Sequence, residues 1–96
     1  MSLRKKQSEF ARKVALLIHF AYEQGYEITF GDAWAKSGHK KGSYHYQRLA
    51  IDLNLFRDGK YLQETEDHEP LGLFWESLGG TWGGRFKDGN HYSWGE

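Results

Sequence analysis

The chain has 96 residues, 13 basic and 13 acidic side chains, a formal net charge of zero and no cysteine. This length suits one small domain over residues 1–96 and is too short for two. The balanced charge argues against a dedicated nucleic-acid binder, and no disulfide can form. No apolar run approaches the length of a membrane span. We expect a monomeric domain that has neither nucleic acid nor a membrane as its partner.

The N-terminal stretch, from about residue 4 to residue 24, is typical of an amphipathic helix. Apolar residues recur in it at helical spacing, namely Phe10, Val14, Leu17, Ile18 and Ala21. Gly25 is well placed just past its end, and His19 lies off the apolar stripe and is not expected to bind a metal. Charges interrupt the apolar residues, so we predict no signal peptide and a protein that is cytoplasmic when made.

Residues 26–30 alternate and predict a first strand, and residues 31–42 predict a loop or a short helix. The loop contains His39-Lys40-Lys41, a basic cluster that could contact phosphate. Together with the basic first helix, this cluster supports one alternative from another functional class, a small nucleic-acid-associated phage protein. A solvated loop is the more common role of such a cluster.

Residues 43–56 form the most strand-like run of the chain. Three apolar residues in it share one face at a spacing of two, namely Ile51, Leu53 and Leu55. Residues 57–60 then predict a hairpin turn with Asp-Gly at its centre, followed by a return strand that begins at Tyr61.

Asp52 stands inside this strand and points away from the apolar face. A buried or half-buried aspartate costs stability unless it is paired or bound. His45 is the nearest possible partner in the sequence. This pair is therefore a candidate for chemistry, although a hydrogen-bonded histidine and a strand-edge acid would also explain it.

A second helix is predicted after the return strand. Thr65 or Asp67 can cap it, Pro70 fits its first turn, and its apolar stripe consists of Leu71, Phe74, Trp75 and Leu78. His68 is expected at the surface near the helix start. Residues 91–94 predict a final strand beside Asp52.

The C-terminal region contains the pattern Asp88-x-x-His91. Two histidines and one aspartate, here His45, Asp52 and His91, are a plausible ligand set for a catalytic zinc that keeps one position open for water. A further acid beside the last ligand could accept a proton from that water. Aromatic residues nearby could line a substrate groove or pack in the core, namely Tyr44, Tyr46, Trp82, Tyr92 and Trp94.

These residues resemble a zinc peptidase family that contains VanY-type D-alanyl-D-alanine carboxypeptidases and phage L-alanyl-D-glutamate endopeptidases. The family carries S-x-H-x-x-G-x-A-x-D and, later, an acid three places before a histidine. The matching residues here are Ser43, His45, Ala50, Asp52, Asp88 and His91. The similarity extends over residues 26–94 and is closest to small phage and prophage members, which share the Gly/Trp-rich segment at residues 78–86.

The resemblance implies an α+β fold, with a small antiparallel sheet flanked by helices and a zinc site on the sheet. It implies that zinc is held by His45, Asp52 and His91, and that Asp88 is the general base. The implied substrates are the peptide stems of peptidoglycan. The implied place of action is the bacterial cell wall or the periplasm, which the protein would reach after release, as endolysins do.

Two departures from the family pattern concern positive charge. Arg48 stands where the motif has glycine, and the arginine that relatives carry after the first strand is missing, since Trp34-Ala35-Lys36 stands there. We expect Arg48, or failing that Lys36, to polarise the scissile carbonyl. The alternative is a catalytically impaired relative that binds peptidoglycan. Which bond is cut stays open between the L-Ala–D-Glu and D-Ala–D-Ala linkages.

Overall fold

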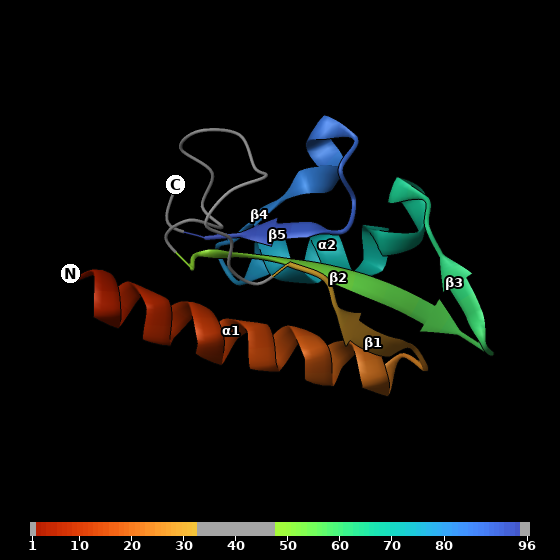
Figure 1. Cartoon of the computed structure of the whole chain (residues 1–96), viewed down its shortest axis with the longest axis horizontal. Coiled ribbons are helices and arrows are strands. Elements are labelled where there is room, and N and C mark those ends of the chain that lie inside the picture. Colours follow the sequence, from red (N-terminus) through yellow and green to blue (C-terminus); the bar gives the residue numbers. More distant parts are fainter. Residues whose placement is uncertain (1, 33–47, 95–96) are drawn as a thin grey trace.

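The structure is a computed structural model, and it describes residues 2–32 and 48–94. It contains the helices α1 (Leu3–Glu23) and α2 (Glu69–Ser77) and the short 3-10 helices η2 (Thr65–His68) and η3 (Gly83–Phe86). Its strands are β1 (Glu27–Phe30), β2 (Ala50–Arg57), β3 (Lys60–Leu62), β4 (Thr81–Trp82) and β5 (His91–Ser93). All strand pairs are antiparallel. The expected α+β class is confirmed (Figure 1).

Strand β2 is the centre of the sheet. One of its edges pairs with β1, through residues 53–56 of β2. Its other edge pairs with β5 through residues 50–52 and with β3 through residues 55–57. Strands β5 and β3 therefore follow one another along the same edge of β2, and Leu53 and Asn54 face the interval between them.

Both described helices pack against one face of this sheet (Figure 1). The alternating residues of β2 supply the sheet side of the core, and α1 and α2 supply the other side. The buried members from these elements are Phe10, Val14, Leu17 and Ala21 of α1, Leu71 and Trp75 of α2, and Ile51, Leu53, Leu55, Trp82 and Tyr92 of the sheet. Since side chains alternate along a strand, Asp52 and Asn54 project from the opposite face.

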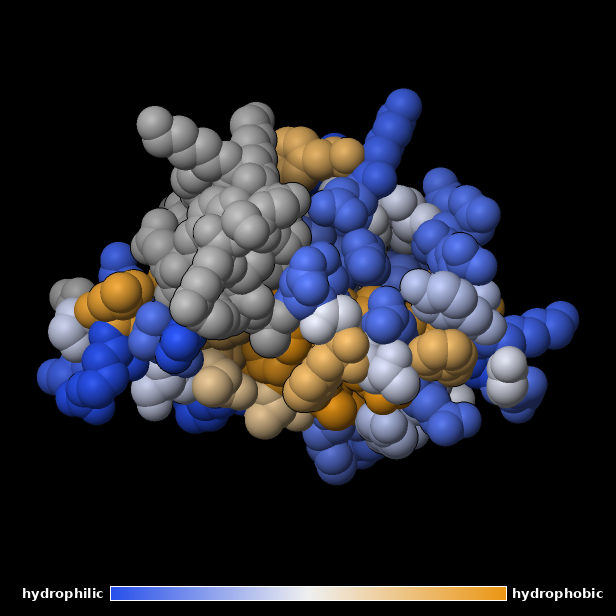
Figure 2. Space-filling model, in the orientation of Figure 1, coloured by the Kyte–Doolittle hydropathy of each residue, from blue (hydrophilic) through white to orange (hydrophobic). Residues whose placement is uncertain are grey.

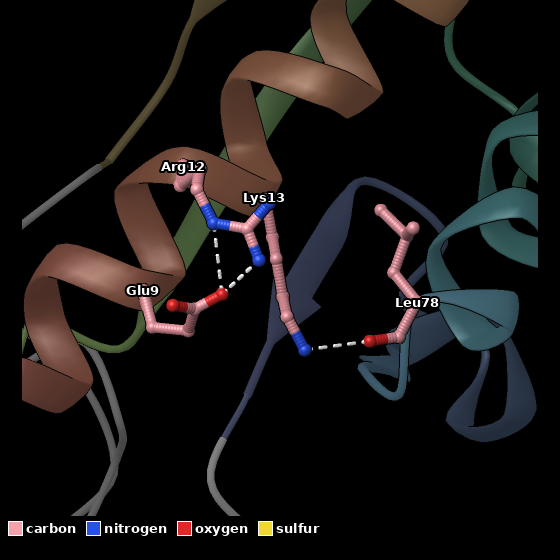
Figure 3. A network of polar contacts seen from close by, with 4 residues as sticks. All are labelled: Glu9, Arg12, Lys13 and Leu78. Carbon is pink, nitrogen blue, oxygen red and sulfur yellow. Dashed lines mark hydrogen bonds and ion pairs between the residues drawn. The ribbon is translucent and has the colours of Figure 1, made fainter.

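Helix α1 is fixed at its start and again half-way along its length. Ser2 caps it by accepting a hydrogen bond from the backbone N–H of Lys5. Lys13 donates from Nζ to the carbonyl oxygen of Leu78 at 2.7 Å, just past α2, and lies 4.5 Å from the ring centre of Trp94. Figure 3 shows this contact beside the exposed Glu9–Arg12 ion pair. A cation at the C-terminal end of a helix is favourable because it complements the unpaired carbonyls there.

The hairpin turn has the conformation that the sequence predicted, whereas the predicted helix cap is wrong. Asp58 and Gly59 both have positive φ, at 52° and 79°, as a two-residue hairpin turn requires. The cap of the second helix was predicted at Thr65 or Asp67, and this is wrong. The N-cap of α2 is His68, and the 3-10 helix η2 before it is capped by Glu64, whose backbone N–H donates to the Asp67 carboxylate in a capping box.

An apolar hollow of about 710 Å³ lies between α1 and the sheet, with Phe10, Val14, Phe30 and Ile51 among its lining residues. Figure 2 shows hydrophobic side chains reaching the surface near the centre of that view, with hydrophilic side chains around them. Neither of the two described α-helices combines the length and the apolar run that crossing a bilayer requires.

Candidate metal centre

Asp52 and His91 meet on the sheet face opposite the helices. They are directly paired across β2 and β5. The N–H of Leu53 donates to the carbonyl of Asn90 at 2.9 Å, so Asp52 and His91 form a non-hydrogen-bonded pair, the type that brings side chains closest. Their Oδ1 and Nδ1 atoms are 3.2 Å apart, and the side chains are 21% and 23% exposed. The predicted neighbourhood of the final strand and Asp52 is confirmed.

The backbone of Asp52 is held from the β1 side as well. Its N–H donates to the carbonyl of Asp32 at 2.7 Å, and its carbonyl accepts from the N–H of Gly31 at 2.8 Å. Two residues therefore oppose one, as in a β-bulge. A Cβ at Gly31 would lie 3.1 Å from the Cβ of Asp52, closer than ordinary contact. Gly31 thus leaves room for the carboxylate on a central strand that cannot easily move.

His91 follows a tight turn that also carries Asp88. The N–H of His91 donates to the carbonyl of Asp88 at 3.1 Å, and the N–H of Asp88 donates to the carbonyl of Gly83 at 2.9 Å. A Cβ at Gly83 would lie 2.3 Å from the Asp88 carbonyl oxygen and 2.8 Å from the Cβ of His91. The turn can therefore close over η3 only because residue 83 has no side chain.

Arg48 has a backbone conformation that explains the family glycine at its position. Its φ is 59°, the left-handed region in which glycine pays no steric penalty. The residue is exposed, and it borders the apolar hollow beside Ile51 and α1. The departure in sequence thus leaves the turn in the conformation that a glycine would favour.

The remaining predicted residues lie outside the described ranges. These are His45, together with Ser43, Tyr44, Tyr46, Lys36 and the cluster at residues 39–41. Within residues 2–32 and 48–94, no three histidine or acidic side chains gather in a metal-binding group. The described chain therefore brings two of the three predicted ligands together, and the third stays a prediction.

A profile of the D-alanyl-D-alanine carboxypeptidase family matches residues 36–94, which is more than half of the chain. The chain belongs to this family. The family indicates a peptidase that acts on the peptide of the bacterial cell wall. A comparison with curated proteins gives no match.

Family membership implies zinc, and the described residues fit it. Two ligands at 2.0–2.1 Å from a tetrahedral ion are about 3.3 Å apart, close to the 3.2 Å between Asp52 Oδ1 and His91 Nδ1. Imidazole nitrogen and carboxylate oxygen are also ligands that suit zinc. The two side chains are also partly exposed, at 21% and 23%.

His68 was predicted at the surface, and this is wrong. It is 2% exposed, and its Nδ1 lies 2.8 Å from the hydroxyl of Tyr92. The error arises because Tyr92 comes from β5, far along the chain, and covers the ring. Tyr92 and Trp82 are also buried, which assigns both to the core and excludes them from a substrate groove. His19 is a surface residue, 74% exposed at its side chain and beside Glu23.

The buried His68 should make this peptidase sensitive to acid. Burial lowers the pKa of His68 to about 4, an effect that outweighs the nearby Asp67. The unfolded chain, with an ordinary histidine pKa near 6.5, then takes up the proton first. We expect stability to fall by up to about 3 kcal/mol as the pH drops from 6.5 toward 4.

The measurement is urea denaturation of metal-free protein between pH 7 and pH 4, for wild type and His68→Asn. An asparagine amide can keep the bond to Tyr92 and does not titrate. The difference in unfolding free energy between the two proteins should shrink as the pH falls. Parallel curves over the whole range would contradict the assignment.

Sequence reasoning missed Gly31 and Gly83. Neither is chemically active, yet each provides the space in which a candidate ligand sits. A glycine one residue after a predicted strand, and glycines in the segment that leads to Asp88-x-x-His91, were the available signals. Their partners only become apparent when the strands are paired.

Proposed function

We propose that this family member is a zinc-dependent peptidase that cleaves the peptide stems of bacterial cell wall, with a metal-activated water as nucleophile. The observation that carries the proposal is the Asp52–His91 pair, a carboxylate and an imidazole held 3.2 Å apart on the sheet face opposite the helices. Asp88 stands at the acidic position of the family motif, three residues before His91, and it is exposed.

His45, Asp52 and His91 would hold the ion. Zinc, when bound, lowers the pKa of a coordinated water and polarises the scissile carbonyl. Asp88 accepts a proton as a general base and passes it to the leaving amine. The turn that joins its backbone to Gly83 and His91 keeps the main chain of residue 88 at a constant place relative to the last ligand.

The substrate is a peptidoglycan stem, and the bond is either L-Ala–D-Glu or D-Ala–D-Ala. The Gly/Trp-rich segment shared with small phage members favours the endopeptidase. The protein acts as a monomer at the cell wall or in the periplasm after release, in the manner of an endolysin. The zero net charge gives no support to the alternative of a nucleic-acid partner.

The experiment is zinc reconstitution followed by digestion of purified muropeptides, with products identified by mass spectrometry. We expect about one zinc per chain and a rise in melting temperature that chelation reverses, since a ligand that binds only the folded state stabilises it. New amino termini at D-Glu identify the endopeptidase, and released D-Ala identifies the carboxypeptidase. Protein that retains no zinc contradicts the proposal.

The missing family arginine favours a second candidate, a relative that binds zinc and cell-wall peptide without hydrolysing it. If the enzyme is active, a cation should stabilise the oxyanion, and Arg48 and Lys36 are the two candidates. Removing an oxyanion donor typically costs about 10²–10³ in kcat. Arg48 borders the hollow against α1, so this role requires its side chain to reach the other face of the sheet.

We expect either Arg48→Gly or Lys36→Ala to lower hydrolysis of wall peptide by that factor at unchanged zinc content. Glycine is the appropriate replacement at position 48, because it keeps the positive φ and removes only the charge. Arg48→Lys should restore part of the activity if the charge matters. Two variants that match wild type would show that neither cation acts on the carbonyl.

A further inference from the structure

A polar cavity of about 190 Å³ lies in the interval between β5 and β3 along the edge of β2. Leu53 and Asn90 line it, joined by their backbone hydrogen bond. Leu53 directly follows Asp52, and Asn90 directly precedes His91. The cavity is therefore one residue away, along both strands, from the candidate metal ligands.

His68 is the buried polar side chain in the wall of this cavity. Its Nδ1 is occupied by the Tyr92 hydroxyl at 2.8 Å. In the part of the chain that the structure describes, its Nε2 has no partner. A buried nitrogen without a hydrogen bond costs roughly 1–3 kcal/mol, so a group bound in the cavity would remove a real penalty.

The cavity offers donors to such a group. Burial keeps His68 neutral, and its Nδ1 lies at hydrogen-bond distance from the Tyr92 hydroxyl. When that hydroxyl donates to Nδ1, the ring proton is on Nε2 and can be donated into the cavity. Thr65 Oγ1 already accepts from the N–H of Gly89 at 3.2 Å, which leaves its own hydrogen to donate. Lys87 adds a positive charge to the wall.

Asp88 also lines the cavity. It is the residue that the proposed function assigns to proton delivery at the leaving amine. The part of the substrate that departs with this amine must therefore lie beside Asp88. Lys87 offsets the charge of Asp88, so a second negative group can be accommodated there.

We propose that this cavity binds a carboxylate on the substrate residue that carries the leaving amine, with His68 Nε2 and Thr65 Oγ1 as its donors. The proposal rests on the proposed function and names its substrate recognition. Two sources supply this chemistry. One is the free α-carboxylate of D-glutamate after an L-Ala–D-Glu bond, and the other is the terminal carboxylate after a D-Ala–D-Ala bond.

The first experiment compares each substrate with its amide. Zinc-loaded protein receives an L-Ala–D-Glu peptide and its α-carboxamide, and a peptide ending in D-Ala–D-Ala and its C-terminal amide. We expect kcat/KM to fall about ten- to a hundredfold for the amide of the pair that is cleaved, the range for a hydrogen bond to a charged group. Equal cleavage of acid and amide overturns the cavity assignment and leaves the peptidase intact.

If no peptide is cleaved, the proposed peptidase function fails. Calorimetric binding of the same four peptides then tests separately whether the cavity binds a carboxylate. Tighter binding of an acid than of its amide supports it, and equal binding overturns it.

The second experiment uses a matched pair at position 68. A glutamine amide can occupy the place of Nε2, whereas an asparagine amide occupies that of Nδ1. We expect His68→Gln to keep the preference for acid over amide and His68→Asn to lose it, although both remain folded. A loss of activity toward acid and amide alike in both variants would indicate a merely structural histidine and overturn the proposal.

Lys87→Asn removes the positive charge from the cavity wall and leaves the buried core unchanged. Asparagine tolerates the left-handed φ of 62° at this position. We expect the KM for the acid peptide to rise severalfold and to become less sensitive to salt. The control is Lys5→Gln, at an exposed position of α1, which should change neither the KM nor its sensitivity to salt. A Lys87→Asn variant indistinguishable from this control argues against the carboxylate.

Discussion

Replacing Asp88 by asparagine should abolish most turnover while zinc stays bound. General acid–base groups contribute roughly a hundred- to ten-thousandfold, and an amide of the same shape cannot accept the proton. The backbone contacts of residue 88, to Gly83 and His91, involve main-chain atoms and persist in the variant. The measurement is steady-state hydrolysis of the muropeptide together with zinc content by elemental analysis.

His91→Ala is the matched comparison. It removes a proposed ligand from the end of the same turn, so metal and activity should be lost together. Loss of turnover with zinc retained would identify a general base, whereas loss of turnover together with zinc would identify a ligand. If Asp88→Asn released zinc as completely as His91→Ala, Asp88 would be a ligand and the base would have to be sought elsewhere.

Adding a single methyl group at Gly83 should weaken zinc binding about ten- to a hundredfold. A Cβ there would lie 2.3 Å from the Asp88 carbonyl oxygen and 2.8 Å from the Cβ of His91, so the turn must shift. Overpacking of this kind costs about 1–3 kcal/mol. Gly31→Ala, whose new Cβ meets Asp52 at 3.1 Å, should show a smaller loss of affinity.

The control is Gly59→Asn, in the hairpin, where an added Cβ meets nothing within 4 Å and asparagine accepts the positive φ. Zinc affinity would be measured by chelator competition, with thermal unfolding in parallel. We expect the affinity to follow the order Gly59→Asn, Gly31→Ala, Gly83→Ala, from strongest to weakest. Wild-type affinity in Gly83→Ala would show that the turn adapts and that His91 is not placed by this contact.

Local patterns were sufficient to predict most elements of the fold. The alternation at Ile51, Leu53 and Leu55 predicted β2 and the face that is buried, because a period of two fixes which side chains share a face. Asp58-Gly59 predicted the hairpin, because both residues had to adopt positive φ. These signals lie within a few residues of the structure that they determine.

Features that depend on distant contacts were not predictable. His68 has the sequence context of a surface residue, and only the arrival of Tyr92 from β5 makes it a core residue. The role of Gly83 depends on the turn that begins at Asp88, whose carbonyl oxygen a Cβ at residue 83 would meet. The Asp52–His91 pair lies between these cases. It was expected because the family motifs supplied the long-range information that periodicity lacks, while the place of His45 beside the pair stays a prediction.

The hydrogen bond between Lys13 and the end of α2 limits how far the chain can be shortened without losing its fold. The family match begins at residue 36, after α1 has ended. Yet α1 contributes Phe10, Val14, Leu17 and Ala21 to the core, and Lys13 ties it to Leu78. A protein trimmed to the matched segment would present the apolar side of β2 and α2 to water and would tend to aggregate. Engineering a shorter cell-wall hydrolase from this chain must therefore keep the N-terminal helix or replace its buried surface.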